Sequence, residues 1–136
     1  METGGFKGRT AAVSRRDLYR SCRQRLGLRP NLCYAEYGMT ELSSQAYAAG
    51  ENGRFKLPEW MRVVAVDPAT GRVLQEGRSG ALRFYDLANR PSVLAVQTED
   101  TGRVYRDGFV LSGRMSGAEL RGCSLSYERY LSAGRR

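Results

Sequence analysis

The feature that most constrains the fold is a series of short apolar segments, separated by turn residues, in the second half of the chain. Asp67-Pro68-Ala69-Thr70-Gly71 and Glu76-Gly77-Arg78-Ser79-Gly80 are two of the separators, and proline and glycine at such positions are typical of tight turns. The apolar segments are 60–66, 72–74, 81–87 and 92–98, with two shorter ones that end near Leu111. Strands of this length and spacing predict a small antiparallel β-barrel or rolled sheet.

The first half of the chain predicts one helix. Ser14 is a preferred N-cap residue, and Gly27 is placed to end the helix. Leu18, Cys22 and Leu26 recur at helical spacing, with Tyr19 beside them, which predicts a buried apolar stripe that includes the Cys22 thiol.

A strand is expected after the helix, at 31–37, with Cys33 packed inside it. Residues 2–10 are rich in glycine, and residues 42–57 are polar and interrupted by glycine, so both predict loops. Loop, helix and strand form an α/β edge unit. The expected fold class is therefore α+β, an α/β edge unit (loop-helix-strand) followed by the small antiparallel β-barrel or rolled sheet.

The composition limits the chemistry that this chain can perform. The 136 residues include no histidine and only three scattered cysteines, Cys22, Cys33 and Cys123. This argues against a disulfide framework, the common zinc sites and Ser-His or Cys-His catalysis. No apolar run approaches the roughly 20 residues that cross a bilayer, and residues 1–10 lack the apolar core of a secretory signal. We therefore expect a cytoplasmic protein with no membrane span.

The net charge of +8 comes almost entirely from arginine. A basic surface suits a polyanion, which includes nucleic acid and the phosphates of a nucleotide. The arginines are spread along the chain, whereas surfaces that bind nucleic acid usually cluster them among aromatic residues. The distribution therefore favours a solvated surface over a nucleic-acid groove.

One stretch, Tyr37-Gly38-Met39-Thr40-Glu41, places an aromatic ring, a glycine, a hydroxyl and a carboxylate at the end of the expected strand. An aromatic ring can stack on a base, and a glycine lets the backbone approach a ligand. A hydroxyl can reach a phosphate and a carboxylate can hold Mg²⁺. The stretch predicts a nucleotide-phosphate site, although so short a motif also occurs by chance.

The same stretch resembles the Tyr-Gly-x-Thr-Glu signature of the adenylate-forming enzymes, and three later segments resemble motifs of that superfamily in the same order. The turn at 67–71 followed by 76–82 is similar to its D-P-x-T-G and E-G-x-x-G-E-L pattern. Gln97-Thr98-Glu99-Asp100 stands where the superfamily has Thr-Gly-Asp, with glutamate in place of glycine. The segment 111–114 stands at its Gly-Arg hinge entry.

The two ends of the chain resemble one branch of that superfamily, the LuxE-type acyl-protein synthetases (long-chain-fatty-acid–protein ligases). Arg121-Gly122-Cys123-Ser124 is similar to the segment near their C-terminus whose cysteine carries the acyl group. Thr3-Gly4-Gly5-Phe6-Lys7 is similar to their Thr-Gly-Gly-x-Lys segment. The loop that grips the ATP phosphates in these enzymes is not in this sequence, so the chain resembles their C-terminal portion and is expected to be inactive alone.

The resemblance implies a role for each matching residue. The cofactors would be ATP and Mg²⁺, with Glu41 as the metal ligand, and the substrate would be a fatty or other carboxylic acid. Thr40, Glu41 and Cys123 would be catalytic, with Cys123 accepting the acyl group and passing it to a partner such as a reductase or a carrier protein. The nucleotide would be bound by Gly4, Gly5, Tyr37, Gly38, Thr40, Asp100 and Arg114.

The expected domains are 1–57, the end of an α/β adenylate-binding subdomain, 58–114, a small β-barrel subdomain, and 115–136, a C-terminal segment with the Arg-Gly-Cys-Ser motif. Three other functions stay open. The chain could belong to an adenylating ligase that forms acyl-CoA, it could be a non-catalytic basic barrel that binds nucleic acid or a protein partner, or it could be a degenerate remnant. The sequence does not determine the length of the acyl chain, the acyl acceptor or the oligomeric state.

Overall fold

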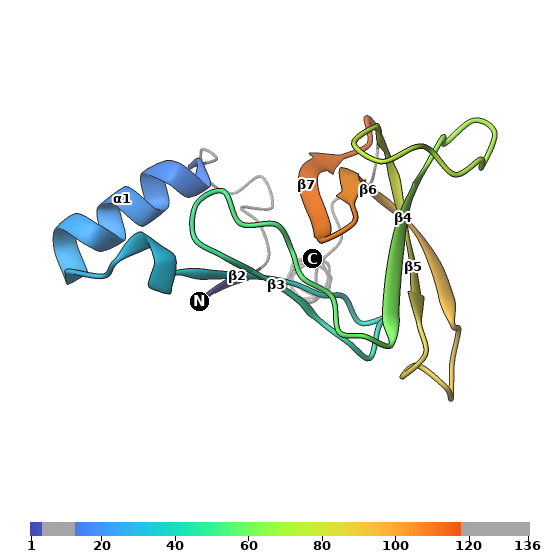
Figure 1. Ribbon diagram of the computed structural model, residues 1–136, viewed down its shortest axis with the longest axis horizontal. Coiled ribbons are helices and arrows are strands. Elements are labelled where there is room, and N and C mark those ends of the chain that lie inside the picture. The colour runs from blue at the N-terminus through green and yellow to red at the C-terminus, as the bar shows by residue number, and fades with distance from the viewer. Residues whose placement is uncertain (4–12, 118–136) are drawn as a thin grey trace, which may run out of the picture.

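The computed structural model of the protein describes residues 1–3 and 13–117 (Figure 1). Its first part contains β1 (Glu2–Thr3), α1 (Arg15–Leu26), η1 (Pro30–Leu32), β2 (Tyr34–Tyr37) and β3 (Ala46–Ala49). Its second part contains β4 (Met61–Val66), β5 (Ser79–Asp86), β6 (Ala95–Tyr105) and β7 (Gly108–Arg114). The class is α+β, as the sequence predicts. No helix among the described residues is long and apolar enough to cross a membrane.

The helix begins and ends where its capping residues predict. The Ser14 hydroxyl oxygen accepts a hydrogen bond from the Asp17 N–H at 3.1 Å, and Gly27 adopts a left-handed conformation at φ 65°. The expected apolar stripe is wrong in detail. Tyr19 is the buried side chain of α1 and Cys22 is half-buried, whereas Leu26 is 67% exposed.

The first sheet has the order β1-β2-β3, with β1 parallel and β3 antiparallel to the central strand β2. Two of its strands lie in segments that the sequence analysis assigned to loops. β3 has Ala46 and Ala48 completely buried between exposed neighbours, so burial outweighs the weak strand preference of alanine. The expected strand at 31–37 is shorter, because η1 occupies its first part, and Cys33 is buried just before β2.

The second sheet is an antiparallel meander in the order β4-β5-β6-β7. It is an open sheet, so the closed-barrel form of the prediction is wrong and the sheet form is confirmed. The segment 72–74 contributes only an isolated bridge, Val66 to Val73. β6 is a single strand of 11 residues, where the sequence analysis expected a break at Thr101-Gly102. A bulge in the β6–β7 pairing occurs at that point instead.

The two sheets share one core. At one end of this core, the β2–β3 connection contacts the end of β5 and the residue before β4 (lower right in Figure 1). Phe55 joins the two sheets, because it pairs with Phe109 of β7 while its neighbour Lys56 pairs with Tyr47 of β3. The buried core consists of Ala35, Tyr37, Leu42, Ala46, Ala48, Phe55, Met61, Val63, Leu82, Phe84 and Phe109. This core holds the end of β2, and with it the candidate site, against the second sheet.

Candidate functional site

Three of the predicted site residues, Tyr37, Asp100 and Arg114, are brought together although they lie far apart in the sequence. The Tyr37 hydroxyl at the end of β2 donates a hydrogen bond of 2.7 Å to Oδ2 of Asp100 on β6. The other carboxylate oxygen of Asp100 lies 3.2 Å from Nε of Arg114. Asp100 and Arg114 are directly opposite each other in the β6–β7 ladder, so strand register sets this ion pair.

Tyr37 is a core residue in this structure, with 7% of its surface exposed. Its ring stacks on Phe84 with centroids 5.2 Å apart and meets Phe55 and Phe109 edge-on. Burial, followed by the hydrogen bond to Asp100, raises the pKa of the Tyr37 hydroxyl far above its usual range. The hydroxyl therefore stays a donor that orients Asp100, and the adenine-stacking role stays a prediction.

Glu99, at the position where the chain differs from the Thr-Gly-Asp motif, contacts Arg114. Its Oε2 accepts a hydrogen bond of 3.0 Å from Nη2 of Arg114, so Arg114 is held by two neighbouring carboxylates. The Thr98 hydroxyl lies inside the same segment, donating to the Leu82 carbonyl at 2.8 Å and accepting from the Asp100 N–H at 3.2 Å. A hollow of about 280 Å³ is lined in part by Thr98 and Glu99.

Thr40 and Glu41 lie on an exposed turn directly after β2. The Leu42 N–H donates to the Met39 carbonyl at 3.1 Å, which closes this turn. Gly38, before the turn, is also exposed, and a Cβ on it would lie 3.1 Å from Cγ of Gln45. Within residues 1–3 and 13–117, the exposed Glu41 carboxylate makes no ion pair.

Two buried side chains that the sequence analysis missed hold the end of this turn and the residues that follow it. Asp86, at the end of β5, is fully buried, and its Oδ2 accepts hydrogen bonds from the backbone N–H groups of Ser43 at 3.0 Å and Ser44 at 2.9 Å. The Asn89 side-chain amide donates to the Glu41 carbonyl at 2.8 Å. An aspartate and an asparagine three residues apart before a proline predict a turn, and their sequence pattern carries no further signal.

The remaining predicted site residues lie outside the described part of the chain. These are Gly4, Gly5 and Cys123, together with the segment 125–132, for which a helix or strand was expected. In the described part, no group of three or more aspartate, glutamate or cysteine side chains is arranged to hold a metal ion. A Mg²⁺ ion bound to a nucleotide needs fewer protein ligands, because phosphate oxygens and water supply the rest. The single exposed carboxylate of Glu41 fits that requirement.

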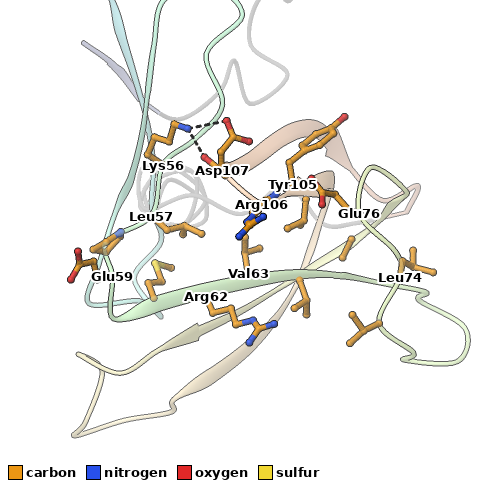
Figure 2. Close-up of a pocket in the computed structure, with 17 residues that line it drawn as sticks. Lys56, Leu57, Glu59, Arg62, Val63, Leu74, Glu76, Tyr105, Arg106 and Asp107 are labelled. Atoms are coloured by element: carbon orange, nitrogen blue, oxygen red, sulfur yellow. Dashed lines mark hydrogen bonds and ion pairs between the residues drawn. The ribbon is translucent and has the colours of Figure 1, made fainter.

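A larger groove, of about 630 Å³, lies along β4 and contains none of the predicted site residues (Figure 2). Its apolar lining includes Leu57, Val63 and Leu74. At one end, Nζ of Lys56 lies 3.0 Å from Oδ2 of Asp107, and the Lys56 and Asp107 side chains point toward each other (Figure 2). The groove is therefore separate from the Tyr37–Asp100–Arg114 cluster.

Comparison with known proteins gave matches at the level of structure. No protein-family model and no curated protein matches the chain. The structure of McyG A-PCP complexed with phenylalanyl-adenylate matches with a TM-score of 0.57 and 19% identity, over 76% of this chain and 23% of that chain. Apo MatB from Rhodopseudomonas palustris matches with a TM-score of 0.58 and 19% identity, over 79% and 24%.

A third match is O-succinylbenzoate coenzyme A synthetase (MenE) from Bacillus subtilis in complex with AMP, with a TM-score of 0.50 and 21% identity, over 78% of this chain and 25% of that chain. The chain thus spans about a quarter of the length of the structures that it matches. At these identities the likeness is one of fold. The chain has the fold of one part of the adenylate-forming enzymes.

Proposed function

We propose that this chain forms one side of the nucleotide-binding site of an ATP-dependent enzyme, which activates a carboxylic acid as an acyl-adenylate. The observation that carries the proposal is the Tyr37–Asp100–Arg114 cluster. The motif resemblance names these residues independently at three separate places in the sequence, and a hydrogen bond of 2.7 Å and an ion pair of 3.2 Å join them. The likeness to structures solved with an acyl-adenylate and with AMP supports the same proposal.

In this proposal the Thr40–Glu41 turn and the Asp100–Arg114 pair face the nucleotide. Asp100 would accept hydrogen bonds from ribose hydroxyls, and Arg114 would contact the ribose or a phosphate. Thr40 would donate to the α-phosphate or the acyl carbonyl, and Glu41 would hold Mg²⁺. The ion would neutralise the negative charge that develops on phosphate oxygens as pyrophosphate leaves. The rest of the triphosphate site would come from polypeptide outside these 136 residues.

We further propose that the acyl group passes to Cys123, as in the acyl-protein synthetases that the sequence resembles. The thiol loses its proton to solvent, the thiolate attacks the carbonyl carbon of the acyl-adenylate, and AMP leaves as a thioester forms. A fatty acid is the expected substrate, and a reductase or carrier protein the expected final acceptor. Coenzyme A is the alternative acceptor, because one of the matched structures is a coenzyme A synthetase.

Carboxylate-dependent exchange of labelled pyrophosphate into ATP tests the first step in the full protein that contains this chain. Exchange should require a carboxylic acid and Mg²⁺, and Glu41→Gln should lower it at least tenfold. Glu59→Gln is the matched control, since Glu59 is an exposed carboxylate at the separate groove along β4. Absence of exchange with short, medium and long carboxylates would refute adenylate formation.

Covalent labelling with a radioactive carboxylic acid tests the second step. Cys123→Ser should abolish labelling and leave pyrophosphate exchange intact, because the serine hydroxyl is a far weaker nucleophile than a thiolate. Cys22→Ser is the control, since Cys22 is a half-buried thiol on α1. Labelling that persists in the Cys123 variant would refute this acceptor, and acyl transfer to added coenzyme A would support the alternative.

A further inference from the structure

We propose that Asp86 is a positioning residue that sets the place of the Thr40–Glu41 turn in the candidate site, with Asn89 acting beside it. Neither residue contains a predicted catalytic atom, and neither belongs to a motif used above. The inference rests on the proposed function, because the turn matters for activity only if Thr40 and Glu41 act on a nucleotide.

The Asp86 carboxylate is fully buried and accepts four hydrogen bonds. Oδ2 accepts from the N–H groups of Ser43 and Ser44, and Oδ1 accepts from the Ser44 hydroxyl at 2.9 Å and the Ala88 N–H at 3.0 Å. No cation pairs with Asp86 in residues 1–3 and 13–117. A buried charge without a cation is costly unless hydrogen bonds satisfy it, so the carboxylate depends on the loop as much as the loop depends on it.

Asn89 extends this clamp to the turn itself. Its amide nitrogen donates at 2.8 Å to both the Glu41 carbonyl and the Val93 carbonyl. Its amide oxygen accepts from the Ser43 hydroxyl at 3.0 Å. The backbone of Glu41 is therefore tied to the loop after β5, and the exposed Glu41 carboxylate extends from a backbone that cannot shift freely.

A carboxylate does something here that an amide of the same shape cannot. The Ser43 and Ser44 N–H groups both point at Oδ2, and both oxygens of Asp86 act only as acceptors. An asparagine at this position has one acceptor oxygen and one NH₂ donor, so at least one buried donor must lose its partner. Asp86→Asn is thus a nearly isosteric change that releases the loop without leaving a cavity.

Asp67 offers a matched control. It follows the opposite end of β4 and also accepts backbone hydrogen bonds from a turn, from the Ala69 and Thr70 N–H groups at 2.8 and 3.3 Å. Asp67→Asn makes the same chemical change in a turn that contains no predicted site residue, and an asparagine keeps the one oxygen that accepts both bonds. A loss shared by both variants would reflect the removal of a carboxylate as such, and a loss confined to Asp86→Asn would reflect the hydrogen bonds to the loop before β3.

The experiment compares the Mg²⁺ dependence of pyrophosphate exchange in the full protein for wild type, Asp86→Asn and Asp67→Asn. A misplacement of about 1 Å can lower a rate about a hundredfold. We expect Asp86→Asn to lower the exchange rate 10- to 100-fold and to raise the half-saturating Mg²⁺ concentration, with an unchanged KM for the carboxylic acid. Hydrogen exchange of the Ser43 and Ser44 amides should accelerate at least tenfold, and Asp67→Asn should match wild type in all of these.

Partial unfolding would reduce the rate without changing the Mg²⁺ concentration at half-saturation, so that concentration separates positioning from a merely structural role. If Asp86→Asn does not fold, Asn89→Asp replaces it, because it removes the donor to the Glu41 carbonyl and keeps the side-chain shape. Wild-type Mg²⁺ dependence in a folded variant overturns the positioning role alone. Absence of exchange in wild type overturns the proposed function and this inference with it.

Discussion

Replacement of Tyr37 by phenylalanine isolates the hydrogen bond that joins the two sheets at the candidate site. A phenylalanine ring can keep the contacts with Phe84, Phe55 and Phe109, so the variant loses only the donor to Asp100. Hydrogen bonds to charged groups contribute about 1.5–3 kcal/mol to stability. Asp100 keeps its ion pair with Arg114 and is partly exposed, so we expect the lower end of that range at pH 7.

The cost of Tyr37→Phe should disappear at alkaline pH. Folding raises the pKa of Tyr37, whereas an unfolded tyrosine has a pKa of about 10. Above that pH the unfolded wild-type chain loses a proton that the folded chain keeps, so wild-type stability falls by ~1.4 kcal/mol per pH unit from this group. Phenylalanine does not titrate. The two proteins should therefore be about equally stable near pH 11.

Urea denaturation followed by far-UV circular dichroism at pH 7 and pH 11 measures both quantities. Tyr85→Phe is the control, since Tyr85 lies on the exposed face of β5 and its hydroxyl has no partner in the described residues. It should change stability by less than about 0.5 kcal/mol at pH 7 and keep the alkaline loss. A stability difference between wild type and Tyr37→Phe that is the same at both pH values would refute a buried, neutral Tyr37.

Three further outcomes test other parts of the molecule. Gly102→Ala would place a Cβ 2.4 Å from the Val110 carbonyl oxygen, so the urea midpoint should fall, and an unchanged midpoint would contradict the β6–β7 register. Phe109→Ala removes a fully buried ring between the sheets and should cost about 3–5 kcal/mol in unfolding free energy; a cost below about 1 kcal/mol would contradict the shared core. Filter binding at low salt should show no retention of DNA, because several arginines already lie in ion pairs, and salt-sensitive retention would revive the nucleic-acid alternative. These arginines are Arg15, Arg16, Arg20, Arg54 and Arg114.

Local signals in the sequence predicted the elements whose ends are marked by capping or turn residues. α1 begins after Ser14 and ends before Gly27 as expected, because each residue satisfies backbone groups at a helix end. β3 escaped prediction because its alanines become strand residues only when the second sheet buries them. The open second sheet could not be distinguished from a barrel, since closure depends on whether the first and last strands meet and no short segment encodes that.

The residues of the candidate site also divide into those that the sequence predicted and those that it did not. Tyr37, Asp100 and Arg114 could be named from motifs. Strand pairing brings Asp100 and Arg114 together, whereas Tyr37, in the other sheet, reaches Asp100 through a side-chain hydrogen bond across 63 positions. Asp86 and Asn89 could not be named, because a turn is all that their sequence pattern predicts. What makes them notable is burial together with partners 42 to 48 residues away, and neither is visible before the chain is folded.

The positions of these residues argue for a rigid wall at the candidate site. The stretch from Tyr37 to Glu41 begins at a ring fixed in the core by Phe84 and by the hydrogen bond to Asp100. It ends at a backbone carbonyl held by Asn89, just before the amides bound to Asp86. The first anchor belongs to the second sheet and the other to the end of β5 and the loop that follows it, so the exposed Thr40 and Glu41 lie between two fixed points. Groups that must meet a nucleotide within a fraction of an ångström benefit from such support, whereas an ordinary connection between strands does not require it.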